Sequence, residues 1–127
     1  MIPKFRAWDK HEQKMFANNE LIIWNGNVYA NDSKKLTCNN LKGWSIDDEC
    51  LMQSTGLKDR NGKEIFEGDI VSIDTDEFDL LFVKYEVGIY CLMDDEGCAE
   101  YLSDYYIYVS VVGNIYENKE YLKKRGN

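Results

Sequence analysis

The chain has 127 residues, 44% of them hydrophobic, and a formal net charge of −8. This composition excludes an intrinsically disordered chain, and the length is enough for one domain with its own core. No stretch approaches the roughly twenty apolar residues of a membrane-spanning helix. The charged start, Met1-Ile-Pro-Lys-Phe-Arg6, does not resemble a secretory signal. We therefore expect a cytoplasmic protein with reduced cysteines and no membrane contact.

The excess of acidic residues lies in one part of the chain. Residues 1–50 hold seven basic and seven acidic side chains, whereas residues 51–127 hold eight basic and sixteen acidic ones. Between residues 70 and 110 the only basic residue is Lys84, against ten acidic residues. A surface that binds nucleic-acid phosphates needs the opposite charge. Nucleic acid is therefore not a favoured partner, and the charge change near residue 50 indicates two subregions.

The first fifty residues are predicted to form β-hairpins. Asn25-Gly26 is a two-residue hairpin signal, because both residues tolerate positive φ. Residues 31–40 are polar and predict a loop. In the ambiguous segment 41–52, Asp47-Asp48-Glu49 fits either the first turn of a helix or a loop before a Cys50-Leu51-Met52 strand, which we favour. The other expected strands are residues 3–8, 14–17, 21–24 and 27–30.

The densest turn chemistry lies between residues 51 and 73. Thr55-Gly56 is expected to interrupt the preceding run. Asn61-Gly62 suits a type I′ hairpin turn and Glu67-Gly68-Asp69 a second turn, so both glycines are expected to have positive φ. Two turns within ten residues predict a small, strongly bent β-barrel or sandwich. Structural turn roles are assigned to Asn61, Gly62, Gly68 and Asp69.

The rest of the chain continues as strands and ends in a short helix. Acidic turns are expected at residues 74–79 and 94–97, and Val87-Gly88 is expected to end or bulge a strand. Asn118 is a candidate N-cap for a helix at residues 119–124. The expected strands are residues 70–73, 80–86, 89–93 and 105–112.

The predicted fold class is therefore mostly β, in a single domain over residues 1–127. Its subregions are N-terminal hairpins (1–50), a barrel-like β part (51–118) and a short C-terminal helix with its tail (119–127).

Three pieces of the sequence resemble the YopX family of phage and prophage proteins. The longest is residues 53–71, which contain Thr-Gly-Leu-Lys-Asp-x-Asn-Gly-Lys-Glu-Ile-Phe-Glu-Gly-Asp-Ile-Val. Lys4-Phe-Arg-Ala-Trp-Asp9 is similar to the family's opening and Val112-Gly-Asn-Ile-Tyr-Glu-Asn118 to its closing motif. Ser54 stands where an aromatic residue is common, and Lys119 where proline is common. The resemblance implies a phage origin, hence a bacterial host cell, and this fold; it implies no particular activity.

No metal site is predicted from the cysteines or the acidic turns. Asp74-x-Asp76-x-x-Asp79 lacks the glycine and glutamate of an EF-hand loop, which leaves an irregular cation site or, in preference, a solvated acidic turn. His11 is the single histidine. No Cys-x-x-Cys spacing occurs among the four cysteines, which are Cys38, Cys50, Cys91 and Cys98.

No catalytic residue or cofactor is predicted either. Glu64, Glu67 and Asp69 are close enough in sequence for acid–base work, but hydrogen bonding within the turn is the favoured interpretation. Nucleophile motifs and phosphate-binding glycine-rich loops are missing from the sequence. We therefore expect a protein that is not an enzyme.

A tyrosine-rich segment supplies the candidate interface. On an alternating strand over residues 105–112, one face carries Tyr105, Ile107, Val109 and Val111, and a core on the other side leaves this face for a partner. The alternatives are that residues 1–50 cover it, or that bases stack on the tyrosines.

The sequence thus predicts a phage or prophage accessory protein that acts by protein–protein interaction. Its expected partners are its own copies in a homo-oligomer, or a host or phage protein. Two alternatives stay open: a nucleic-acid-binding small β-barrel, and an enzyme with a scattered active site.

Overall fold

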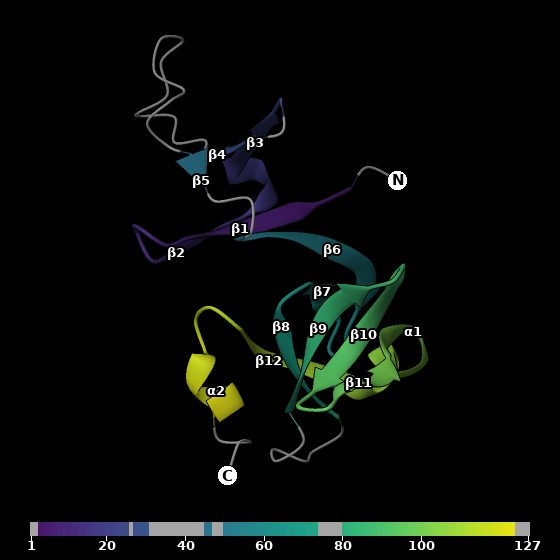
Figure 1. Cartoon of the computed structure of the whole chain (residues 1–127). Helices are drawn as coiled ribbons and strands as arrows, with labels where there is room; N and C mark the ends of the chain where they lie inside the picture. Colours follow the sequence, from purple (N-terminus) through teal and green to yellow (C-terminus); the bar gives the residue numbers. More distant parts are fainter. Residues whose placement is uncertain (1–2, 26, 31–44, 47–49, 74–79, 124–127) are drawn as a thin grey trace, which may run out of the picture. The chain divides into compact units, whose positions relative to one another are not determined.

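The computed structural model describes residues 3–25, 27–30, 45–46, 50–73 and 80–123 (Figure 1). The predicted loop at 31–40, the acidic turn at 74–79 and Cys38 lie outside these ranges. Strands dominate the described residues, which confirms the prediction of a mostly β fold. The chain divides into two compact units, Met1–Gln53 and Ser54–Asn127. This division falls three residues after the end of the expected hairpin region.

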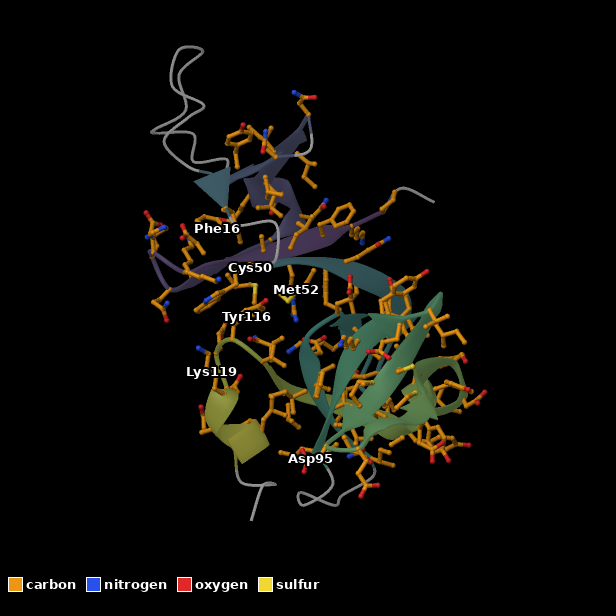
Figure 2. The ribbon with its side chains drawn as sticks, in the orientation of Figure 1. Phe16, Cys50, Met52, Asp95, Tyr116 and Lys119 are labelled. Carbon is orange, nitrogen blue, oxygen red and sulfur yellow. The ribbon has the colours of Figure 1, made fainter. Side chains whose placement is uncertain are left out.

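The first unit consists of short antiparallel strands. β1 (Phe5–Asp9) pairs with β2 (Lys14–Phe16), and β3 (Leu21–Trp24) with β4 (Asn27–Ala30). A 3-10 turn, η1 (Asn18–Glu20), precedes β3, and β5 (Ser45–Ile46) adds to β4. Trp24 pairs with Asn27 and Asn25 has φ 51°, as expected of the Asn-Gly hairpin. Phe16, Cys50 and Met52 are buried (Figure 2).

β6 (Leu51–Lys58) runs through the point where the units divide. In the first unit Gln53 pairs with Phe5, and in the second Ser54 pairs with Phe66 of β7 (Glu64–Phe66). The predicted interruption at Thr55-Gly56 is wrong, because the strand continues to Lys58 with a register shift. Gly56 has φ 79°, and the Thr55 hydroxyl donates to the Ile65 carbonyl (2.7 Å). The glycine therefore bends the strand without ending it.

The second unit contains a five-stranded antiparallel sheet that curls into a half-barrel (Figure 1). The strand order is β11-β10-β9-β8-β12. Both edge strands have a register shift against their neighbours, after Leu92 of β10 and after Val111 of β12. The five strands are β8 (Asp69–Ile73), β9 (Leu80–Glu86), β10 (Ile89–Asp94), β11 (Gly97–Tyr101) and β12 (Val109–Asn114).

The core of this unit lies on one face of the sheet. Val71 pairs with Leu81, and Val83 with Leu92, so these residues share a face in neighbouring strands. The partly buried side chains that pack on this core are Leu57, Ile73, Tyr90, Tyr105, Tyr106 and Val111. The cluster of buried residues consists of Ile65, Val71, Leu81, Val83, Leu92, Leu102 and Val109.

Residues 102–108 are helical, which corrects the predicted strand at 105–112. They form α1 (Leu102–Tyr105) and η4 (Tyr106–Tyr108), and β12 begins only at Val109. The physical reason is a helical spacing of the residues that pack inward: Leu102, Tyr105, Tyr106 and Val109 lie at positions i, i+3, i+4 and i+7. This spacing outweighed the β propensity of the tyrosines and of Ile107.

The turn after β6 is built around Asp59 and is not of type I′. Gly62 has φ 84°, as predicted, but Asn61 does not have positive φ. Gly62 N–H donates to the Asp59 carbonyl (3.0 Å) and Asp59 N–H to the Lys63 carbonyl (2.8 Å). The Asp59 carboxylate also accepts from Asn61 N–H and Lys63 N–H, both at 2.9 Å. These bonds hold a three-residue loop in which only the glycine is left-handed.

The chain ends in a short helix, α2 (Lys119–Lys123). The Asn118 carbonyl accepts from Tyr121 N–H (3.0 Å), but the Asn118 side chain accepts from Asn114 N–H (3.1 Å). The predicted side-chain N-cap is therefore replaced by a contact that bends the chain after β12. A Cβ at Gly113 would collide with the Asn118 side chain, so any other residue here would displace that side chain from its contact with Asn114.

Candidate protein-binding surface

The β9–β10 hairpin carries exposed apolar side chains at its tip. Tyr85 pairs with Tyr90, and the two rings meet edge-on with centroids 5.0 Å apart. The turn is Val87-Gly88, with φ 49° and 82°, so it separates two strands and does not bulge one. The Val87 side chain is 98% exposed. A β-branched residue rarely adopts a left-handed conformation, which costs roughly 1–2 kcal/mol.

The helical segment after β11 adds two more exposed side chains. α1 packs against β10 and β11, and Leu102 is fully buried there. Tyr105 contacts Tyr108 edge-on, with ring centroids 6.3 Å apart. Ile107 and Tyr108 are 54% and 50% exposed. The buried leucine therefore anchors a short segment that presents apolar groups to solvent.

Most exposed apolar side chains of the described ranges belong to this one stretch. Eight large hydrophobic side chains are exposed there, and all but Ile23 and Val112 lie between residues 85 and 108. We call these six the 85–108 surface, although the strand register divides them between two faces: Tyr85 pairs with Tyr90 on the core face, whereas Ile89 and Tyr101 align with Cys91 on the other face. The six are Tyr85, Val87, Ile89, Tyr101, Ile107 and Tyr108.

A cavity lies along the neighbouring edge strand. Its volume is about 240 Å³, and it is lined by Cys98, Ala99, Glu100 and Tyr101 of β11. Tyr101 lies opposite Cys91 in the β10–β11 pair. The cavity is therefore an open pocket along one edge strand, with both polar and apolar lining residues.

The sequence around the 85–108 surface is acidic. The only basic side chain near it in sequence, Lys84, forms an ion pair with Glu86 (Nζ···Oε1 3.0 Å). Burial, followed by the charge of Glu67 and by Tyr85, raises the pKa of Tyr90. The acidic residues of this stretch are Glu86, Asp94, Asp95, Glu96, Glu100 and Asp104. Asp95 lies in the β10–β11 turn (Figure 2).

Two cysteines meet beside this surface. The Cys98 thiol donates to the Glu100 carbonyl (Sγ···O 3.4 Å). A hydrogen bond with Cys91, then burial, then the charges of Cys91, Glu86 and Glu100 raise the pKa of Cys98 to about 11. Cys91 is buried, whereas Cys98 is exposed, and both are free thiols.

Of the residues assigned to turns, Asn61, Gly62 and Gly68 lie in turns, whereas Asp69 is the first residue of β8. Gly68 has φ 83°, and its N–H donates to the Val83 carbonyl (2.8 Å). The Asp69 carboxylate accepts from Phe66 N–H (2.8 Å). Glu64 accepts a hydrogen bond from the Ser54 hydroxyl. The carboxylates considered for acid–base work therefore have partners within the fold.

Sequence analysis identified the turn that begins at Asp59 but gave the Asp59 carboxylate no role of its own. It is buried and accepts from Val111 N–H (2.8 Å) in addition to its bonds within the turn. Burial raises the pKa of Asp59, but the backbone hydrogen bonds from Val111, Lys63 and Asn61 and the charge of Lys63 outweigh it, so the net pKa is lowered. The Asp-x-Asn-Gly pattern was the available signal, since a side-chain carboxylate commonly accepts from the residue two positions on.

The four residues of the predicted interface do not share a face. Val109 is fully buried and Val111 packs on the core, whereas Ile107 is exposed and Tyr105 is partly buried in the helical segment. The strand alternation on which that interface depended is wrong, because the strand starts at Val109. Only Ile107 of the four belongs to the 85–108 surface.

In the described ranges no group of three or more His, Cys, Asp or Glu side chains is placed to hold a metal ion. None of the helices within those ranges has the length and apolar character needed to cross a bilayer.

The fold defines a strand-rich protein with a curled sheet, and comparison with known proteins gives its family. The chain belongs to the YopX protein family, which it matches over residues 4–123. It is similar to the crystal structure of protein EF1440 from Enterococcus faecalis, with a TM-score of 0.66 and 30% sequence identity over 96% of this chain and 99% of that chain. The search of curated proteins found no match. The resemblance found in the sequence is thereby confirmed.

Proposed function

We propose that this protein is a non-catalytic binding module that receives a positively charged protein partner on its 85–108 surface. The family resemblance to phage and prophage proteins supports an accessory role in the cytoplasm of a bacterial host. The partner is then a host or phage protein.

Val87 is the observation that carries this proposal. Its left-handed backbone costs free energy, and a side chain that is 98% exposed returns no packing to offset that cost. Asparagine or glycine would form the same turn more favourably. An exposed valine in a strained position is therefore explained by a contact with something outside the chain. Tyrosine and isoleucine around it are residues that supply contact area in protein interfaces.

The acidic residues near this surface indicate the charge of the partner. Six acidic residues and no basic residue lie between positions 85 and 108. This field repels nucleic-acid phosphates and a second copy of the chain, which carries a net charge of −8. It attracts lysine and arginine side chains of a protein surface. A basic protein partner is therefore favoured over self-association and over nucleic acid.

Affinity capture with matched variants tests the proposal. The parent chain and Val87→Glu are immobilised and exposed to lysate from phage-infected bacteria, and bound proteins are identified by mass spectrometry. A basic protein that the parent captures should be lost on Val87→Glu, because a carboxylate then enters an apolar contact. The same partner, once purified, should bind more weakly as salt concentration rises.

Val112→Glu is the matched control, since Val112 is 41% exposed in β12 and lies outside the 85–108 surface. It should keep the captured partner. Loss of the partner on both substitutions, or on neither, contradicts the proposal. Melting temperatures within a few degrees of the parent establish that the variants are folded. Sedimentation of the parent at several concentrations measures self-association separately.

A further inference from the structure

The two edges of the five-stranded sheet differ in what covers them. At the β12 edge, Arg60 N–H donates to the Val109 carbonyl (3.0 Å) and Val111 N–H to the Asp59 carboxylate (2.8 Å). The backbone groups of this edge are thus bonded by the chain's own turns, so it offers little to an incoming strand.

The opposite edge is β11, and among the described residues no strand pairs with its outer side. Cys98, Ala99 and Tyr101 are exposed on it. An uncovered edge presents N–H and C=O groups to another extended chain, which gains backbone hydrogen bonds by joining the sheet. The cavity of about 240 Å³ lies along the same four residues, Cys98 to Tyr101. A strand added here would therefore have space beside it for a side chain.

The register of β11 leaves one residue outside the β10 pairing. Leu92 pairs with Glu100 and Met93 with Cys98, so Ala99 is an extra residue at a bulge. A bulge at a sheet edge disturbs pairing at that point with any added strand, from an identical chain or from a partner. The acidic residues Glu96 and Glu100 flank this bulge, and their negative charges repel a second copy of the acidic chain. The same charges favour an extended segment that carries lysine or arginine.

We propose that β11 accepts an extended, basic segment of the partner protein as a sixth strand of this sheet. The proposal rests on the proposed function and adds the binding mode: backbone hydrogen bonds along Gly97–Tyr101, acidic side chains facing the basic residues of the segment, and one side chain of the segment in the cavity. The exposed apolar groups of the 85–108 surface then contact the body of the partner.

A synthetic probe tests the binding mode without the natural partner. The probe is a fluorescein-labelled eight-residue peptide of alternating lysine and threonine, and its control alternates glutamate and threonine. Fluorescence anisotropy should give saturable binding of the lysine peptide by the parent and none of the glutamate peptide. Ala99→Pro should weaken the lysine peptide at least tenfold, because proline in the middle of β11 fixes φ and removes one backbone N–H of this strand. Proline is tolerated at edge bulges, so this variant should stay folded.

Ala99→Ser, which keeps the N–H, should bind within about twofold of the parent. In the parent, hydrogen exchange at the amides of residues 97–101 should slow when the lysine peptide is present. This measurement does not depend on the variant, so it tests the proposal even if Ala99→Pro is unstable. Absence of saturable binding, equal binding by Ala99→Pro and the parent, or unchanged exchange would overturn the added strand. If the added strand fails these tests but a protein is still captured by the parent and lost on Val87→Glu, the proposed function still holds. A dimer seen in sedimentation and abolished by Ala99→Pro would assign the edge to a second copy and overturn the basic segment.

Discussion

Two tight turns of the second unit are built in opposite ways. At residues 59–63 a glycine takes the left-handed position, and the buried Asp59 carboxylate accepts three backbone N–H groups. At Val87-Gly88 a β-branched residue takes a left-handed position with its side chain in solvent. The first turn satisfies every local preference and closes a sheet edge. The second keeps a costly conformation at the surface, which is expected where a contact with a partner matters more than stability.

The largest expected effect comes from removing the centre of the first turn. Asp59→Ala should lower the free energy of unfolding by about 3 kcal/mol, because three backbone donors lose a charged acceptor in a buried position. Urea denaturation measures the change. Asp95→Ala is the control, since Asp95 is exposed in the β10–β11 turn, and it should change stability by less than about 0.5 kcal/mol. Equal effects of the two substitutions would contradict the role of Asp59.

The glycine of the first turn should come next. Gly62→Val should cost about 2 kcal/mol, because valine must adopt φ 84°. No atom lies within 4 Å of the Cβ position, so the cost is one of backbone conformation and not of collision. Gly62→Asn should cost clearly less in the same denaturation experiment, since asparagine tolerates this region. A valine variant as stable as the parent would show that the loop relaxes to another conformation.

The second turn should respond with the opposite sign. Val87→Asn should raise the free energy of unfolding by about 1 kcal/mol, because Asn-Gly is favoured where both central residues have positive φ. Thermal melting measures the gain, and capture of the partner measures the accompanying loss of binding. Ile89→Asn is the control for lost apolar area, since Ile89 is 44% exposed on the adjoining strand. Destabilisation by Val87→Asn would refute strain at this turn.

The smallest expected effect is a pH dependence of the first turn. The pKa of Asp59 is lowered below its usual value of 3.8 in the folded protein, with burial opposed by backbone hydrogen bonds. Its contribution to stability is therefore present above that usual value and is lost as pH falls through the folded-state pKa. The difference in unfolding free energy between the parent and Asp59→Asn should shrink between about pH 5 and pH 2. If this difference in unfolding free energy stays constant over the range, Asp59 does not contribute to the loss of stability in acid.

Local signals predicted most of the strands and failed where tertiary packing decides. Asn25-Gly26 specifies a hairpin by itself, and β8 follows from its β-branched residues. The helical segment was missed because the tyrosines at 105, 106 and 108 favour strands, while the burial of Leu102 selects the helix. The loop at Asp59 was assigned the wrong turn type, since its third hydrogen bond comes from Val111, 52 residues away.

The binding surface was predictable only in part. Ile107 and Tyr108 lie in the tyrosine-rich segment that the sequence singled out as the candidate interface, whereas the sequence did not predict that Tyr85, Val87 and Ile89 would be exposed. Their exposure follows from the register of β9 against β10 and from the end of the sheet at Gly88. The spacing of nearby residues in the sequence specifies neither the strand register nor the point at which the sheet ends.

The contact between Cys98 and Cys91 has a practical consequence for chemical labelling. Because the pKa of Cys98 is raised to about 11, its side chain stays in the thiol form at neutral pH, whereas alkylating reagents attack the thiolate. Iodoacetamide should therefore modify this exposed residue far more slowly than an ordinary surface cysteine. Reagent that reaches it at alkaline pH would place a spectroscopic probe on β11, within the strand where an added segment would be detected.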